Sequence, residues 1–117
     1  MHELALVENI LDTVRISAIT NEIKQVGRIK LVIGKLSMAL PDNLEFAFSC
    51  LQQQDQLFAE AYLDIEERNV VVRCSTCDVE FPIEQNEAYQ CPHCQQNNIT
   101  LISGRELYID YFEGNDT

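Results

Sequence analysis

Basic residues are scarce in this chain. Lys and Arg account for 8 of its 117 residues, against 19 Asp and Glu, so the formal net charge is −11 at pH 7 and the sequence pI is near 4.4. Binding to DNA or RNA requires clustered Lys and Arg side chains that neutralise phosphates. This charge balance argues against a nucleic-acid partner and fits metal cations or basic protein surfaces instead.

Segments that would insert into a membrane or direct export are also missing. No apolar run approaches the roughly 20 residues that a membrane-spanning helix needs, so no membrane partner is expected. The first residues lack a basic start followed by a long apolar run, which speaks against a secretory signal. The sequence contains no nucleophile motif and no phosphate-binding loop. We therefore expect a cytoplasmic protein that is not an enzyme.

Four of the 5 cysteines form two pairs, Cys74-Ser-Thr-Cys77 and Cys91-Pro-His-Cys94. A two-residue spacer lets one tight turn direct both sulfurs of a pair at the same ion, and two such pairs at this separation are typical of a four-thiolate zinc site. Zinc held by four thiolates keeps no open position, so its role would be structural. His93, inside the second pair, could replace a cysteine in some states, but we expect it to be solvated.

Two disulfides or a redox-active pair are the alternatives for these cysteines. Disulfides need an oxidising compartment, and the missing signal segment speaks against export. A redox-active pair normally opens a helix after a strand, and only one pair would be expected. The pattern therefore favours zinc over both alternatives.

Helical and strand periodicities alternate along the rest of the chain. Apolar residues at three- and four-residue spacing predict a helix from His2 to about Ile19 and a second one after Pro41, which Asp42 and Glu45 would begin as a capping box. Cys50 lies on this second helix and is expected in the core. Strands are expected at Ile29–Lys35, Ala61–Glu67, Ile99–Ile102 and Arg105–Phe112, before a frayed tail, and Val70–Val72 would lead the chain into the first cysteine pair.

This order of elements predicts an α+β fold. A small three-stranded sheet would be covered by two helices, with a four-cysteine zinc-ribbon module inserted before the last strand. We expect residues 1–69 and 103–117 to form one domain and residues 70–102 to form the zinc-binding domain. Phe81 and Tyr89, between the two cysteine pairs, would supply the apolar packing of the zinc hairpin.

The N-terminal Met1-His2-Glu3 segment is a second candidate for metal binding. The His2 ring nitrogen and amide nitrogen would close one chelate, and a free amine on Met1 would close another with the same amide. Such planar, nitrogen-rich coordination suits Ni(II) or Cu(II), and the Glu3 carboxylate could complete it. On the residues alone, a histidine at position 2 is more often an exposed terminal residue than a ligand.

Short segments in a fixed order carry a further signal. They are Met1-His2-Glu3-Leu4, Gly34-Lys-Leu-Ser37, Pro41, Leu44-Glu-Phe46-Ala-Phe48, the two cysteine pairs and Gly104-Arg-Glu-Leu107. Together they resemble the HypA/HybF family of hydrogenase nickel-incorporation proteins over essentially the whole chain. The resemblance implies a nickel metallochaperone with a nickel-binding α/β domain and a zinc domain. It makes His2 the key nickel ligand, with Glu3 beside it. Some members use a further carboxylate after the first main strand; Asp42 lies in about that region, where we expect it to cap the helix.

The same resemblance implies one structural zinc ion and one transported nickel ion per chain. It implies two partners, the nickel-handling GTPase HypB and the large-subunit precursor of a [NiFe]-hydrogenase, and urease is a further client in some organisms. The expected function is binding of Ni(II) at the N-terminus and its delivery for hydrogenase maturation. The alternative is a zinc-ribbon adaptor that binds only proteins, with His2 idle. A homodimer is left open.

Overall fold

The computed structural model describes residues 3–83 and 90–115, and the chain divides into two compact units. The first unit comprises Met1–Val32, Ala39–Glu66 and Tyr108–Thr117. The second unit comprises Ile33–Met38 and Glu67–Leu107. The fold is α+β, as the residue pattern predicts, with two three-stranded sheets. No helix among the described residues is long and apolar enough to cross a membrane.

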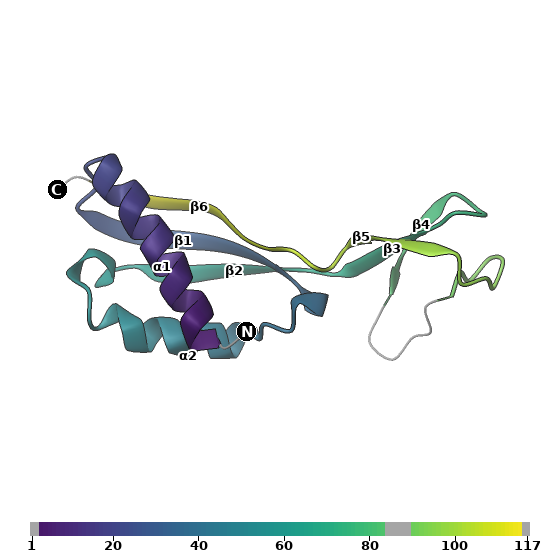
Figure 1. Ribbon diagram of the computed structural model, residues 1–117, viewed down its shortest axis with the longest axis horizontal. Coiled ribbons are helices and arrows are strands. Elements are labelled where there is room, and N and C mark those ends of the chain that lie inside the picture. The colour runs from purple at the N-terminus through teal and green to yellow at the C-terminus, as the bar shows by residue number, and fades with distance from the viewer. Residues whose placement is uncertain (1–2, 84–89, 116–117) are drawn as a thin grey trace. The chain divides into compact units, whose positions relative to one another are not determined.

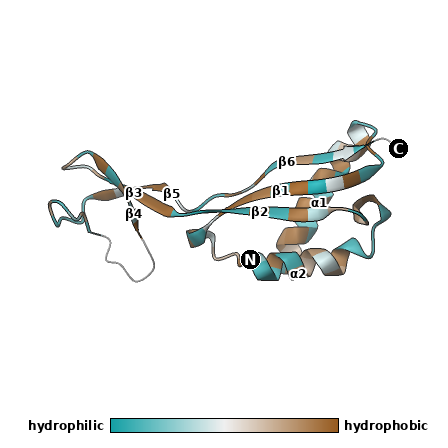
Figure 2. Cartoon of the chain, turned by 180° about the vertical axis from the view of Figure 1, so that it is seen from behind, coloured by the Kyte–Doolittle hydropathy of each residue, from teal (hydrophilic) through white to brown (hydrophobic). Residues whose placement is uncertain are grey.

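The first unit combines two packed helices with a sheet of strand order β2-β1-β6 (Figure 1). The helices are α1 (Glu3–Thr20) and α2 (Pro41–Gln52), and the strands are β1 (Gln25–Gly34), β2 (Tyr62–Arg68) and β6 (Leu107–Asn115). In the middle of β1 the buried Ile29 and Leu31 alternate with the half-buried Arg28 and Lys30, so the strand changes between apolar and polar colours along its length (Figure 2). From Leu31 to Gly34 every residue is buried. The helix stripe predicted for α1 is confirmed, since its buried residues are Val7, Ile10, Leu11, Val14 and Ala18.

Strand directions in this sheet are mixed. Helix α2 and the short 3₁₀ turn η2 (Gln56–Phe58) carry the chain back from the end of β1, so that β2 runs in the same direction as β1 (Figure 1). Strand β6 is antiparallel to β1, because Lys24 N donates to Asn115 O at 2.9 Å while Gly34 N donates to Glu106 O at 2.7 Å.

One end of this antiparallel pair, where the start of β1 meets the end of β6, extends beyond the strands expected from sequence. β1 begins at Gln25 rather than Ile29, and β6 continues to Asn115 where a frayed tail was expected. Apart from the buried Val26, the added residues are polar or glycine and carry little strand propensity of their own. Hydrogen bonding between the two strands decides their conformation, as tertiary context commonly does for strands.

Helix α2 begins differently from the expected capping box. Its N-cap is Leu40, whose side chain makes no capping hydrogen bond, and Pro41 takes the first helical position. Asp42 lies in the first turn, where its charge suits the helix dipole, but it is not the cap. The capping-box prediction is wrong because Pro41, with its preset φ, takes the first helical position, so the helix starts two residues earlier than the box requires.

Cys50 is exposed, so the prediction that it lies in the core is wrong. The buried stripe of α2 is formed by Leu44, Ala47 and Phe48. At 3.6 residues per turn, Cys50 lies beside this stripe, outside the buried face of the helix. Phe46 is on the solvent side too, with 73% of its surface exposed.

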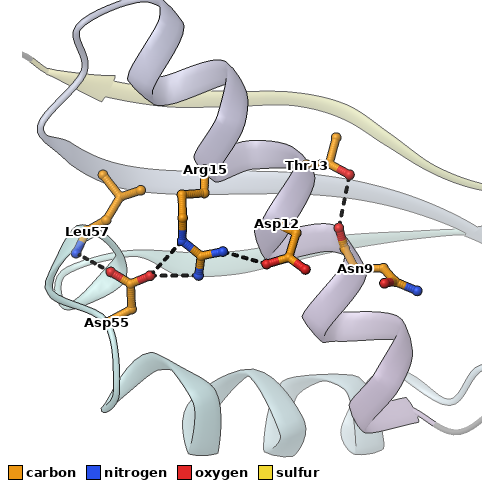
Figure 3. A network of polar contacts seen from close by, with 6 residues as sticks. All are labelled: Asn9, Asp12, Thr13, Arg15, Asp55 and Leu57. Atoms are coloured by element: carbon orange, nitrogen blue, oxygen red, sulfur yellow. Dashed lines mark hydrogen bonds and ion pairs between the residues drawn. The ribbon is translucent and has the colours of Figure 1, made fainter.

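An arginine on α1 joins this helix to the segment that follows α2 (Figure 3). Arg15 donates to Asp55 from Nε at 3.0 Å and from Nη2 at 2.7 Å, and it also pairs with Asp12 one turn earlier on α1. The other oxygen of Asp55 accepts a hydrogen bond from Leu57 N at 3.0 Å and so caps η2. This network of side chains therefore ties α1 to the loop that follows α2, and it also caps η2.

A second arginine lies between two tyrosine rings of the same sheet. The guanidinium carbon of Arg28 on β1 is 5.5 Å from the Tyr62 ring centre and 5.7 Å from that of Tyr111. Arg28 also pairs with Asp64, and this hydrogen bond lowers the pKa of the Asp64 carboxyl from its usual value. All three strands of the sheet contribute to this stack, so it helps to hold their register.

The second unit is a three-stranded antiparallel sheet of order β4-β3-β5. Its strands are β3 (Val70–Cys74), β4 (Val79–Ile83) and β5 (Ile99–Ser103), of which β4 was not expected from the sequence. The core is small: Val70, Val72 and Ile83 are buried, and Leu36, Phe81, Ile99 and Leu101 pack against them. Phe81 thus has the packing role expected for it, whereas Tyr89 lies outside the described residues.

Two glycines allow a close backbone contact within the second unit. A Cβ atom on Gly34 would lie 2.1 Å from both C and O of Gly104. Leu36 N donates to Gly104 O at 2.7 Å, at the start of the 3₁₀ turn η1 (Lys35–Ser37). This contact and the packing of Leu36 place residues 33–38 in the second unit, although the residue pattern assigns them to the first domain.

Replacing Gly34 by alanine is expected to destabilise the protein by at least about 1–3 kcal/mol, because the new methyl group has only backbone atoms to displace. The matched control is Gly27→Ala on the same strand, where a Cβ atom would meet nothing closer than Glu113 O at 3.9 Å. The control should stay within about 1 kcal/mol of wild type. Urea unfolding of both variants checks this, and equal stability of the two would contradict the proposed contact.

Candidate metal centre

Four cysteine sulfurs converge at one end of the second unit's sheet. Their Sγ atoms all lie within 4.8 Å of one another, with 3.6 Å between Cys74 and Cys94 and 3.9 Å between Cys77 and Cys91. Cys74 is the last residue of β3, and the others lie in the turns outside the strands. Cys74 and Cys91 are fully buried, while Cys77 and Cys94 are half-buried.

Each cysteine pair lies in a turn of the same construction. Asp78 N donates to Cys74 O at 2.8 Å, and Gln95 N donates to Cys91 O at 2.8 Å. Asp78 and Gln95 both adopt left-handed backbone conformations, with φ of 58° and 61°. Reversing the chain directly after the second cysteine of a pair turns both sulfurs of that pair towards the same point.

Backbone hydrogen bonds also tie the two turns to the neighbouring chain. Ser75 N donates to Asn98 O at 2.9 Å, and Cys91 N donates to Gln96 O at 3.0 Å. In the first turn, Arg73 pairs with Asp78, the residue with the left-handed conformation. The cluster is therefore held by local turn chemistry as well as by the sheet.

The separation of the sulfurs fits a tetrahedral metal ion. All five cysteines are free thiols, so the disulfide alternative does not describe this structure. A tetrahedron with metal–sulfur bonds of about 2.3 Å has sulfur–sulfur edges of about 3.8 Å, close to the two shorter separations here. Four sulfur ligands would fill such an ion's coordination, which leaves no position for a substrate or a reactive water.

The thiols of this cluster are electrostatically unequal. Backbone N–H groups of Cys94 and His93 point to the Cys91 sulfur and lower its pKa to about 6. Hydrogen bonding with the Cys94 sulfur raises the pKa of Cys77 to about 12. A metal ion bound here must therefore displace protons from the other thiols. The exposed side chain of His93 does not belong to the group of converging ligand atoms.

The N-terminal candidate is described only in part, since His2 lies outside the described residues. Glu3 opens α1 and is half-buried. Its Oε1 accepts a hydrogen bond from Nδ2 of Asn43, in the first turn of α2, at 3.4 Å. Nothing in the sequence signals this contact, because its two residues are forty positions apart and Asn43 lies in none of the segments that carry the family resemblance. Asp42, beside Asn43, is exposed.

Comparison with known proteins gives concordant matches along the chain. The family model described as HypA, hydrogenase/urease nickel incorporation, metallochaperone, matches residues 1–114. A hydrogenase maturation factor HypA from Moorella thermoacetica is 41% identical over 114 residues, covering 97% of this chain and 99% of that relative. The HypA of Pelodictyon phaeoclathratiforme is 36% identical over 109 residues, covering 93% and 92%.

Solved structures show the same fold. The solution structure of the nickel metallochaperone HypA from Helicobacter pylori aligns with a TM-score of 0.67 at 23% identity, over 98% of both chains. A second solution structure of a HypA protein aligns with a TM-score of 0.73 at 22% identity, over 100% of this chain and 98% of that one. At these identities the likeness concerns the fold alone.

Replacing Gln95 by glycine is expected to relieve the left-handed strain in the second cysteine turn. A non-glycine residue costs about 1–2 kcal/mol in this conformation, and the backbone hydrogen bond to Cys91 would be kept. Asn97→Gly is the control, because Asn97 has an ordinary negative φ. The free energy of unfolding of the Gln95→Gly variant should be higher than that of the Asn97→Gly variant by about 1–2 kcal/mol. If urea titrations showed Asn97→Gly to be the more stable variant, the turn geometry would be contradicted.

Proposed function

Because the chain belongs to the HypA family of hydrogenase/urease nickel-incorporation metallochaperones, we propose that it binds one Ni(II) ion at its N-terminus and delivers it for the maturation of a [NiFe]-hydrogenase. The observation that carries this proposal is the family match over residues 1–114, which includes both the N-terminal segment and all four paired cysteines. Nickel is here the cargo of the protein and not a resident cofactor.

We assign the nickel ligands to His2, with Glu3 beside it. An imidazole and nearby backbone nitrogens offer the nitrogen-rich coordination that Ni(II) favours, and a carboxylate adds an oxygen donor. A site built from the first residues of a chain has few covalent constraints. It can therefore exchange its ion with a partner more readily than a closed cage can.

We infer that Cys74, Cys77, Cys91 and Cys94 hold one structural zinc ion. Tetrahedral sulfur coordination favours zinc, and the sulfur separations fit an ion of that size. Zinc would cross-link the two cysteine turns and so stabilise a unit whose apolar core is small. Since a closed site offers no reactive position, we expect no catalytic activity from it.

In this proposal, the first unit binds nickel and the second unit binds zinc. The partners that would receive or load the nickel are the GTPase HypB and the large-subunit precursor of the hydrogenase. The net charge of −11 suits basic partner surfaces. Four metal-binding thiolates require a reducing compartment, which supports a cytoplasmic location.

Removing one cysteine of the cluster is expected to release zinc and loosen the second unit. Cys74→Ala takes away a buried ligand, and in small modules the free energy of zinc binding is partly free energy of folding. Hydrogen exchange should accelerate within residues 67–107, and the zinc content should fall. Cys50→Ser is the matched control, because Cys50 is exposed and outside the cluster. It should keep its zinc and its melting temperature. A zinc-replete Cys74→Ala variant would refute the ligand assignment.

Removing the imidazole of His2 is expected to weaken nickel binding at least about tenfold and to leave the zinc content unchanged. His2→Gln, which keeps the length but lacks the basic nitrogen, should behave like His2→Ala. Nickel titration followed by the absorption bands of the bound ion checks both variants. If the wild-type protein bound zinc but no nickel, the chain would be better described as a zinc-ribbon adaptor that binds only proteins.

A further inference from the structure

Strand β5 lies at an edge of the second unit's sheet. Among the described strands it pairs with β3 alone, so its outer side presents backbone N–H and C=O groups to which a further strand can bind. Two side chains of β5 are exposed, Thr100 and Ile102, and Ile102 exposes 48% of its surface. An open sheet edge of this kind is a place where a second chain can add a strand.

The absence of charge distinguishes β5 from the other edge strands. Proteins commonly protect an open edge with charged side chains or proline, because both hinder pairing with another chain. β4 contains Glu80 and Pro82, β2 contains Asp64, and β6 contains Asp110. Residues 95–104, by contrast, include neither a charged residue nor a proline. Of the four edge strands that the structure describes, β5 is therefore the one without such protection.

We propose that two copies of this chain associate through β5, which pairs antiparallel with β5 of the second copy about a two-fold axis. The two three-stranded sheets would then join into one continuous sheet. A symmetric dimer presents the same residues from each copy, so the strand must be complementary to itself. This inference goes beyond the proposed function and does not depend on where nickel binds.

The sequence of β5 is complementary to itself in one register. With Leu101 opposite its counterpart in the second copy, Thr100 lies opposite Ile102, and Ile99 lies opposite Ser103. Threonine and isoleucine are β-branched and pair well across strands. Ile99 and Leu101 already pack against the apolar core of the second unit. This register would therefore extend the small core of one copy into that of the other.

Charge and contact area set the strength expected for this dimer. A basic partner would be attracted to acidic surfaces, but β5 offers no charge that could recognise one. A five-residue strand buries less than the roughly 800 Å² per partner of a standard interface, so we expect a dissociation constant on the order of 0.1 mM. Each copy carries a net charge of −11, and added salt should strengthen the dimer because it screens the repulsion.

The test is analytical ultracentrifugation of the full-length, zinc-loaded protein over a range of concentrations at low and high salt. We expect a monomer–dimer equilibrium that moves towards the dimer as salt is raised. Ile102→Lys places a charge on the open edge and should raise the dissociation constant at least about tenfold. Ile16→Lys is the matched control, because Ile16 is an exposed isoleucine on α1 and its replacement changes the net charge equally. The control should dimerise like the wild type, and zinc content and melting temperature verify that both variants fold.

Mixing two variants tests the register of the pairing. Thr100→Glu also adds a charge to the edge and should weaken self-association on its own. In a mixture of the Thr100→Glu and Ile102→Lys proteins, the new carboxylate and the new ammonium group would lie opposite each other. Mixed dimers should then form more readily than the dimers of either variant alone. A mixture that associates no better than its separate components would overturn the proposed pairing.

Two further outcomes would overturn the proposal. A wild-type protein that stays monomeric up to about 1 mM at high salt does not pair through β5, and the edge would then be left for a strand of a different protein. Association that persists unchanged in Ile102→Lys would place the contact on another surface. Neither outcome bears on nickel binding, which the His2 variants test separately.

Discussion

Convergence of four cysteine sulfurs on one point is the constraint on which the second unit depends. Among the described residues, the sheet core of this unit contains three buried apolar side chains, too few to order residues 33–38 and 67–107 by apolar burial alone. The turns that end in Asp78 and Gln95 bring the sulfurs within reach of a single ion. The first unit is linked to the second through the order of the chain. Its third strand, β6, follows the strands of the second unit in the sequence.

Much of this arrangement follows from spacing in the sequence. The two C-x-x-C pairs predict the sulfur cluster because a two-residue spacer permits only a narrow range of turns. The three- and four-residue spacing of buried positions predicts α1, and alternation predicts most of β1 and β2. These are local patterns whose physical basis, the period of the helix or strand, operates within a few residues. The resemblance to the family is likewise visible in the sequence, because it is carried by short segments in a fixed order along the chain.

Features that escape prediction are those decided between distant segments. Gln25 extends β1 because β6 is there to pair with it, and Cys50 is exposed because the partner of α2 lies on another side. Gly34 belongs to the second unit because Gly104 approaches its backbone, seventy positions away. The contact between Glu3 and Asn43 is of this kind too, because it joins residues forty positions apart.

If the protein binds both zinc and nickel, as proposed, each ion must be directed to its own ligands. Affinity alone does not separate them, since zinc and nickel lie close together in the general order of metal affinities. Geometry and ligand softness can separate them. A tetrahedron of four buried or half-buried sulfurs suits zinc and has no position through which an ion could be passed on. The proposed nickel ligands, the imidazole of His2 and the carboxylate of Glu3, would instead be nitrogen and oxygen donors, which suit Ni(II) better than they suit the zinc of a sulfur cluster. On the proposed assignment, retention and release would both follow from coordination, because four cysteines would close around the zinc ion while the nickel ion would be held by a different set of ligands.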